Sequence, residues 1–235
     1  MRTVARGSSH ERVWSTATLP QHEQFACWRE IASEAFVPVT LRRFRPGGFR
    51  SAVAGRRVGA LGVSRISSQA QSVARTVADI ERRPGDVFFL NLPLSDGSAA
   101  TQSGRRADLR PGDFAIVDGT RPFELEFARE FRQVSLALPH EALAPLLTSP
   151  GAATAVRVPG DRGVGAVASG AVHALARAGG SFDREAARAI SDHVVGLVAL
   201  ALGGLRAPPR SVGRELLAQA VLDDLGSARH RPFSR

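Results

Sequence analysis

Four side chains in short apolar stretches of the sequence could contact a small molecule. Asn91 comes two positions after Phe89 in an apolar run, and Arg65 and Arg75 each come two positions after a valine. Side chains two positions apart share one face of a β-strand, so these polar groups would point to the same side as their apolar neighbours. A lone amide on an apolar face can orient a ligand, and an arginine can bind a carboxylate through two parallel hydrogen bonds. The candidate ligand contacts are therefore Arg65, Arg75, Phe89 and Asn91.

For the two arginines, a structural role competes with ligand binding and is the favoured one. Arginine is rarely buried without a partner, and its apolar stem can cover a surface while the guanidinium reaches solvent or an acid. Arg65 and Arg75 could thus lie at the rim of a site and pair with acidic residues. A ligand with a carboxylate is expected only if a guanidinium points inward.

Residue sets for catalysis or metal binding are missing from the sequence. No Gly-x-Ser-x-Gly motif marks a hydrolase nucleophile, tyrosine is absent, and Cys27 is expected to pack inside a helix. Residues 163–168 fit Gly-x-Gly-x-x-Ala, but no buried strand precedes them, so they are interpreted as a helix start rather than a dinucleotide site. No histidine lies within residues 58–138, and a metal needs several converging ligands. We therefore expect no catalytic residue, no metal and no cofactor; the histidines are His10, His22, His140, His173, His193 and His230.

Length and composition are those of an ordinary globular protein. The chain has 235 residues, of which 43% are hydrophobic and 23% charged, enough to bury a core in one large or two small domains. A single cysteine rules out an internal disulfide and favours a reducing compartment. No run of about 18 apolar residues could span a membrane, and the polar residues 1–10 differ from a secretory signal. We therefore expect a cytoplasmic protein.

The net charge of +9 is concentrated at the two ends of the chain. All 31 basic residues are arginine: residues 1–57 hold ten of them against four acids, and residues 200–235 hold six against three. The stretch 58–199 is neutral, whereas a nucleic-acid groove normally collects basic residues on the folded body. An arginine-rich solvated surface is the favoured explanation, and ends that approach DNA held by another part are the alternative.

Turn residues divide residues 58–139 into a series of short strands. Two Pro-Gly-Asp turns, at residues 84–86 and 111–113, each open an apolar run. Closely spaced strands with such turns between them predict a small antiparallel barrel or sandwich. The strict alternation of residues 123–127 predicts one buried face and one face in water. The expected strands are residues 58–66, 73–77, 86–94, 113–118, 123–127 and 131–138, and residues 41–57 are expected as a loop or an irregular first strand.

Helical periodicity dominates the rest of the chain. A leading helix is expected over residues 20–36, between Pro20 and Pro38. Two long helices are expected to end at paired glycines and could pack as an antiparallel hairpin. These helices cover residues 161–178 and 183–202, with shorter ones at 140–147 and 214–225. Together the patterns predict an α+β fold in which strands come first and helices follow.

The order of several motifs resembles the ligand-binding domain of AraC-type transcription regulators. The resemblance covers residues 20–225, and the order and spacing of the motifs carry it rather than any single one. The motifs are Phe25-x-x-Trp28-Arg29-Glu30 with Phe36-x-Pro38, Leu61-Gly62 with Arg65-Ile66-Ser67, Val73-Ala74-Arg75-Thr76, Gly104-Arg105 before Leu109-Arg110-Pro111-Gly112-Asp113, and Leu136-Ala137-Leu138-Pro139. The resemblance implies a cupin-like barrel that senses a small-molecule effector, a helical region that forms a homodimer, and a C-terminal DNA-binding domain with two helix-turn-helix motifs.

The last of these implied parts does not fit within the 235 residues. Only residues 226–235 follow the last expected helix, and docking in the major groove needs a complete helix-turn-helix unit. No DNA-binding residue is expected here, so DNA would be reached only through a missing C-terminal domain or a partner. The expected parts are a flexible arm (1–19), a cupin-like sensor barrel with its leading helix (20–139), a helical dimerisation region (140–225) and a tail (226–235).

We therefore expect the ligand-sensing and dimerisation domain of an AraC-type regulator, and no enzyme. Ligand binding would favour one of two states of the arginine-rich residues 1–57 and of the helical interface. One alternative is a stand-alone regulatory partner that forms mixed dimers without touching DNA. A small cupin-like enzyme is the less favoured alternative.

Overall fold

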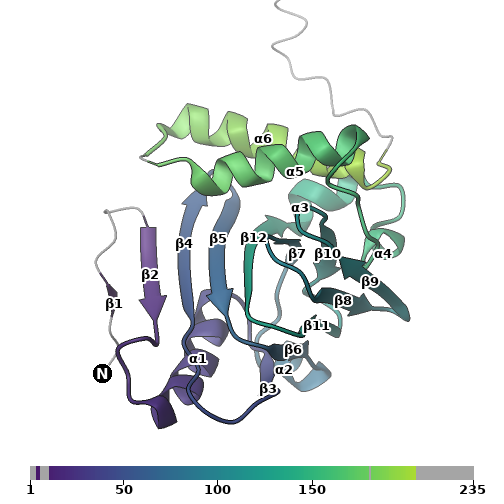
Figure 1. Ribbon diagram of the computed structural model, residues 1–235. Coiled ribbons are helices and arrows are strands. Elements are labelled where there is room, and N and C mark those ends of the chain that lie inside the picture. Colours follow the sequence, from purple (N-terminus) through teal and green to yellow (C-terminus); the bar gives the residue numbers. More distant parts are fainter. Residues whose placement is uncertain (1–3, 6–10, 180, 205–235) are drawn as a thin grey trace, which may run out of the picture.

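The computed structural model describes residues 4–5, 11–179 and 181–204, which form two antiparallel β-sheets and a layer of helices (Figure 1). The larger sheet runs in the order β1 (Val4–Ala5), β2 (Glu11–Ser15), β4 (Ala52–Val58), β5 (Leu61–Ser68), β12 (Phe131–Pro139), β7 (Val87–Pro93) and β10 (Ala115–Asp118). The smaller sheet runs in the order β3 (Thr40–Arg43), β6 (Gln71–Arg75), β11 (Phe123–Phe127), β8 (Ser98–Gln102) and β9 (Arg105–Leu109). No strand joins the two sheets within the described ranges, so the fold is an α+β sandwich and not a closed barrel.

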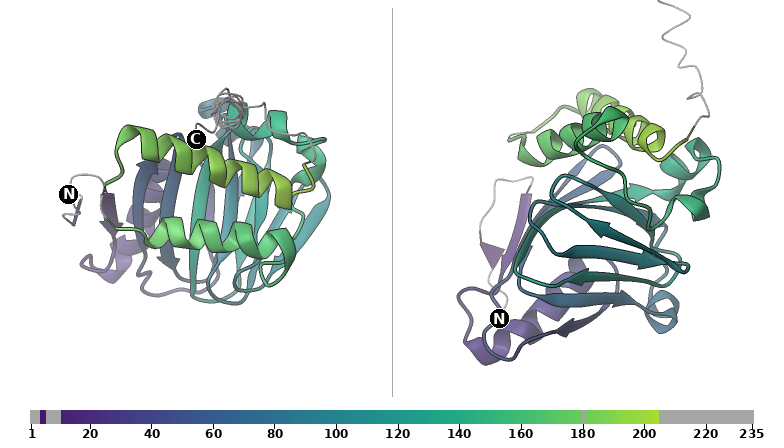
Figure 2. Two further views of the ribbon diagram at one scale, coloured as in Figure 1. Left: turned by 90° about the horizontal axis from the view of Figure 1, so that it is seen from above. Right: turned by 45° about the vertical axis from the view of Figure 1, so that its right-hand side comes forward.

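One long helix lies near the start of the described part, two lie near its end, and a short one lies between β6 and β7. The helices are α1 (Gln21–Ala35), α2 (Val77–Arg82), α3 (His140–Leu143), the 3₁₀ helix η1 (Ala144–Leu146), α4 (Pro150–Ala153), α5 (Gly163–Arg177) and α6 (Arg184–Ala201). The two long helices α5 and α6 lie side by side across the outer face of the larger sheet (Figure 2). The Asp183 carboxylate caps α6 by accepting a hydrogen bond of 2.7 Å from the Ala186 amide. None of the helices in the described part is both long and apolar enough to cross a membrane.

The central strands of the larger sheet are buried on both faces. On β7, Phe88 and Leu90 belong to the core beneath α5 and α6, whereas Phe89 belongs to a second core between the sheets. Val172 of α5 and Val198 of α6 are fully buried in the first of these cores. The alternation of side chains along one strand therefore supplies two hydrophobic cores, one on each side of the sheet.

Most of the expected strands and helices are present, with shifted ends. The expected strands 86–94, 113–118, 123–127 and 131–138 correspond to β7, β10, β11 and β12, and the expected long helices correspond to α5 and α6. The single strand expected at 58–66 is wrong, because Gly59 adopts a left-handed φ of +58° and turns the chain between β4 and β5. The expected helix at 214–225 lies outside the described residues.

Several elements were not expected from the sequence. Residues 11–15, placed in an arm, form β2 and pair with β4 along their whole length, so the arm assignment is corrected for these residues. The β8–β9 hairpin carries too few apolar residues to show strand alternation. Helix α2 begins at Thr76, whose hydroxyl accepts from the Asp79 amide while the Asp79 carboxylate accepts from Thr76 in a capping box. The proposed division into an arm, a barrel and a dimerisation region stays a prediction.

A buried carboxylate fastens the segment before α5 to the edge of the larger sheet. Asp113 accepts hydrogen bonds from Arg157 Nε at 2.5 Å and from the amides of Gly160 and Arg110 at 3.0 Å. Burial by itself raises the pKa of the Asp113 carboxyl, but these hydrogen bonds outweigh it and hold the pKa below its ordinary value. The carboxylate form therefore stabilises the connection between β10 and the helical layer.

Replacing Asp113 by asparagine should reduce stability in a pH-dependent way. A carboxyl whose pKa is lowered by folding contributes stability above its ordinary pKa of about 4, and this contribution is lost as the pH falls through the lower, folded value. We expect Asp113→Asn to lower the free energy of unfolding by about 1–3 kcal/mol at pH 7, and the difference from wild type to shrink below about pH 4. Urea unfolding at a series of pH values measures this.

Asp108→Asn is the matched control, because its carboxylate pairs with Arg106 while its side chain stays 78% exposed. Exposed pairs contribute little, so this variant should stay within about 1 kcal/mol of wild type at every pH. A deficit of Asp113→Asn that remained constant from pH 7 to pH 3 would contradict the assigned role of the carboxylate.

Candidate ligand-binding site

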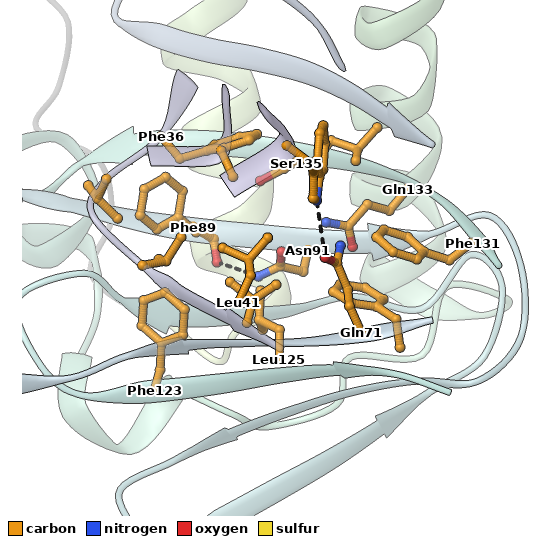
Figure 3. A pocket seen from close by; sticks show the side chains of 17 residues that line it. Phe36, Leu41, Gln71, Phe89, Asn91, Phe123, Leu125, Phe131, Gln133 and Ser135 are labelled. Atoms are coloured by element: carbon orange, nitrogen blue, oxygen red, sulfur yellow. Dashed lines mark hydrogen bonds between the residues drawn. The ribbon is translucent and has the colours of Figure 1, made fainter. Parts of the chain in front are cut away.

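A cavity of about 70 Å³ lies between the two sheets, on the side of the larger sheet that faces away from α5 and α6. Seventeen residues from both sheets and from α1 line it (Figure 3). The hollow interior expected for a sensor is therefore present, although its walls belong to a sandwich rather than to a barrel.

The smaller sheet contributes an apolar floor. Leu41 on β3, Val73 on β6 and Leu125 on β11 are register partners across three neighbouring strands, and all three line the cavity. Phe123 and Phe127 point the same way as Leu125, because residues two positions apart share a face. This confirms the buried face that the alternation of residues 123–127 predicted.

The larger sheet contributes most of the polar groups. Asn91 on β7 is the direct register partner of Ser135 on β12, and Gln133 lies two positions before Ser135 on the same face. All three side chains line the cavity, as does Phe89 (Figure 3). The predicted face of β7 that carries Phe89 and Asn91 therefore faces the cavity, whereas their role as ligand contacts stays a prediction.

Helix α1 closes the cavity from a further side. Trp28, Ala32 and Phe36 recur at helical spacing and all line the cavity. The Trp28 indole N–H donates a hydrogen bond of 3.0 Å to Gln71 Oε1 on β6, which fixes the helix to the floor. Gln24 Oε1 accepts from the Phe49 amide at 2.6 Å and holds the same helix to the chain before β4.

The lining is uncharged, and one of its polar atoms has no partner. None of the seventeen lining residues is Asp, Glu, Lys, Arg or His. Gln133 is 4% exposed, and its Oε1 has no hydrogen-bond partner in the part of the chain that the structure describes. A buried polar atom without a partner costs free energy, so its retention here is a feature that needs an explanation.

Arg75 is buried next to the cavity but does not line it. Only 1% of it is exposed, and its guanidinium donates to the backbone carbonyls of Gly119, Pro38 and Arg83 at 2.7, 2.8 and 2.9 Å. Burial lowers the pKa of Arg75, although an arginine remains charged in proteins. The side chain therefore joins three loops, which is a structural role of the kind favoured for the arginines, although its partners are backbone carbonyls rather than an acid.

Arg65 lies outside the cavity as well. Its Nη2 donates to Glu11 Oε1 at 2.9 Å, and half of its side chain is exposed. Arg65 thus pairs with an acid at the surface, which is the structural role favoured for it from the sequence. Of the four candidate contacts, the structure brings Phe89 and Asn91 together at the cavity and leaves Arg65 and Arg75 elsewhere.

Several lining residues were missed in the sequence. Gln133 and Ser135 share the parity of Phe131 on an expected strand, so the alternation that identified Asn91 would have found them too. Gln71 had no such signal, because the expected strand began only at residue 73. As to metals, no three His, Cys, Asp or Glu side chains gather as ligands among the described residues.

Comparisons with known proteins agree with this geometry. The family model described as "AraC-binding-like domain" matches residues 28–203. The chain is 33% identical over 153 residues to the transcriptional activator NphR of a Rhodococcus species, covering 63% of this chain and 45% of NphR. It is 26% identical over 133 residues to a protein from the nit 5′ region of Bacillus sp. (strain OxB-1), covering 57% of this chain and 52% of that protein. The chain thus spans about half the length of the curated relatives it matches.

Among solved structures, the chain is similar to that of the AraC-like transcriptional activator CuxR. The TM-score is 0.69 at 21% identity, over 85% of this chain and 73% of the other. At this identity the likeness shows the shared fold.

Replacing each of the two arginines tests whether Arg75 has a structural role that Arg65 lacks. Arg75→Met removes the donors of three buried carbonyls, so we expect the free energy of unfolding to fall by about 3 kcal/mol or more. Arg65→Met removes one exposed ion pair and should cost less than about 1 kcal/mol. Chemical denaturation of both variants measures the difference, and equal losses would contradict the structural role of Arg75.

Proposed function

The chain belongs to the AraC-binding-like domain family, and from this premise we propose that it is the effector-sensing part of a transcription regulator. A small molecule would bind in the cavity between the two sheets and change how the rest of the regulator acts. The observation that carries the proposal is the uncharged cavity between the sheets, lined by residues of α1 and of both sheets that lie far apart in the sequence. A regulator of transcription works where the DNA is, so a cytoplasmic location is part of the proposal.

The central strands connect the cavity to the helical layer. Asn91 and Gln133 face the cavity, while Leu90 on β7 and Leu136 on β12 face the opposite core beneath α5 and α6. Packed cores transmit small displacements because they hardly compress. A shift of these strands on ligand binding would therefore reach the helices directly.

Sensing requires that the ligand bind one arrangement better than another. The cavity of about 70 Å³ is smaller than the cavity of about 150 Å³ that accepts benzene in an engineered protein. A ring-sized effector therefore needs an arrangement with more space, and binding would favour that arrangement over the present one. The proposal is binding without catalysis, because the lining offers amides and one hydroxyl but no titratable group.

The proposal includes a homodimer formed through the helical layer. The resemblance to AraC-type regulators implies such a dimer, and Val164 and Val167 lie three positions apart on α5 with 40% and 57% of their surface exposed. Residues at this spacing share a helix face, so they form an apolar patch that a second copy could cover. Contact with DNA would come through a further domain or through a partner.

A larger side chain at the cavity should abolish ligand binding. Ala32→Leu on α1 adds three carbon atoms to the lining and keeps a residue that favours helices. A thermal-shift screen of small organic molecules should find compounds that raise the melting temperature of the wild type, because a ligand of the native state stabilises it. These shifts should disappear in Ala32→Leu.

Ala26→Leu makes the same chemical change on an exposed position of the same helix and should keep every shift. Compounds that stabilised wild type and Ala32→Leu equally would bind elsewhere, and the sensing role of the cavity would be refuted.

The dimer has a separate test. Val167→Glu places a charge in the apolar patch and should turn a dimer into a monomer in light scattering coupled to size-exclusion chromatography. Val77→Glu is the control, since Val77 is 59% exposed on α2, outside the helical layer. An unchanged mass for Val167→Glu would show that this patch is not the interface.

A further inference from the structure

The side-chain amides of the cavity differ in whether they already have hydrogen-bond partners within the protein. Gln71 is fully engaged, because its Oε1 accepts from Trp28 and its Nε2 donates to Ser68 Oγ at 3.3 Å. Asn91 Nδ2 donates to the Phe89 carbonyl of its own strand at 3.3 Å. Gln71 and Asn91 therefore each make at least one hydrogen bond within the protein before any ligand arrives.

The third amide, that of Gln133, holds a fully buried acceptor without a partner in the part of the chain that the structure describes. Gln133 Oε1 has no partner among the described residues, and the residue, which is 96% buried, lines the cavity (Figure 3). A carbonyl oxygen is a hydrogen-bond acceptor, so the group that completes it must be an N–H or an O–H. The free protein bears the cost of this unpaired atom, and a ligand with a donor at this position would remove it.

The same lining excludes charged ligands. A carboxylate or an ammonium group taken from water into a site without an opposite charge loses its hydration with no compensation. Arg75, which is buried next to the cavity, donates through Nε, Nη1 and Nη2 to backbone carbonyls and is not available to a ligand charge. The ligand is therefore uncharged where it contacts the cavity.

Aromatic side chains define the shape of the ligand. Trp28, Phe36, Phe89, Phe123, Phe127 and Phe131 all line the cavity, and they come from α1, β7, β11 and β12 or, for Phe36, from the residue that follows α1. Aromatic rings pack edge-to-face or offset against other rings with a gain beyond the buried area. A flat ring is thus the body that this set of walls fits best.

We propose that the ligand is an uncharged molecule with a ring-shaped apolar body and one N–H or O–H group, which donates a hydrogen bond to Gln133 Oε1. This inference rests on the proposed function, since it names the chemical class of the effector and the residue that selects it.

Three probes of similar size test the ring, the hydrogen-bond donor and the charge of the ligand separately. Phenol has a ring and a donor, toluene has the ring without the donor, and benzoate carries a charge. Calorimetric titration of the full chain at neutral pH should show binding of phenol and toluene, with benzoate at least about tenfold weaker than phenol because its charge would be desolvated.

The variant Gln133→Leu isolates the hydrogen bond. Leucine fills a similar volume without an acceptor, so the ratio of phenol affinity to toluene affinity should fall about tenfold, the amount that one hydrogen bond contributes. The melting temperature of the free variant should stay equal or rise, because the substitution removes an unpaired buried atom. A merely structural glutamine would lower it instead.

Ser98→Ala is the matched control. Ser98 Oγ is another buried atom without a partner in the described part, but it lies outside the cavity lining. Its removal should leave the affinity ratio unchanged.

Each failure points to a different error. An affinity ratio that Gln133→Leu leaves unchanged overturns the assigned hydrogen bond, and benzoate binding as tightly as phenol overturns the uncharged class. If the probes that bind the wild type no longer bind Ala32→Leu, they bind in the cavity, and its sensing role survives either result. Failure of all three probes to bind the wild type overturns the ring-shaped class, and the broader compound screen then decides the proposed function by itself.

Discussion

The structure depends on strands β7 and β12 being buried on both faces. A strand with apolar side chains on each side needs a layer of structure above it and another below. Phe88 and Leu90 require the helix pair, while Phe89 on the same strand requires the smaller sheet and α1. The sandwich, the helical cover and the cavity all follow from this double burial, because the cavity is the part of the inner core that side chains do not fill.

Strand alternation is the part of this arrangement that can be predicted from sequence. Its period of two is local, so the opposite faces of residues 87–94 could be assigned before any tertiary contact was known. The same rule places Gln133 and Ser135 on the cavity side of β12. Which of these polar atoms remains unpaired could not be predicted, because that depends on neighbours such as Gln71 and Trp28, which come from other elements.

Arg75 shows where local patterns stop being informative. Its position on the inner face of β6 follows from parity, but the direction of its guanidinium is decided by carbonyls at residues 38, 83 and 119. These partners are backbone atoms of loops, and no residue type in the sequence identifies them. Strand β8 was missed for a related reason, since its Ser98 and Ala99 are buried between β9 and β11 rather than by a hydrophobic pattern of their own.

The way α1 is held determines how a ligand could change the structure. The strands around the cavity are held by ladders of backbone hydrogen bonds, whereas the contacts of α1 include side-chain hydrogen bonds through Trp28, Gln24 and Arg83, which donates to the Ser33 carbonyl. In the proposed sensing mechanism, α1 is therefore the wall that we expect to move when a ring enters. The chain that leaves α1 reaches Pro38, whose carbonyl accepts from Arg75. In the proposed mechanism, a shift of this segment would also act on the contacts of Arg75, and a ligand would cause it only by binding the shifted arrangement more tightly than the present one.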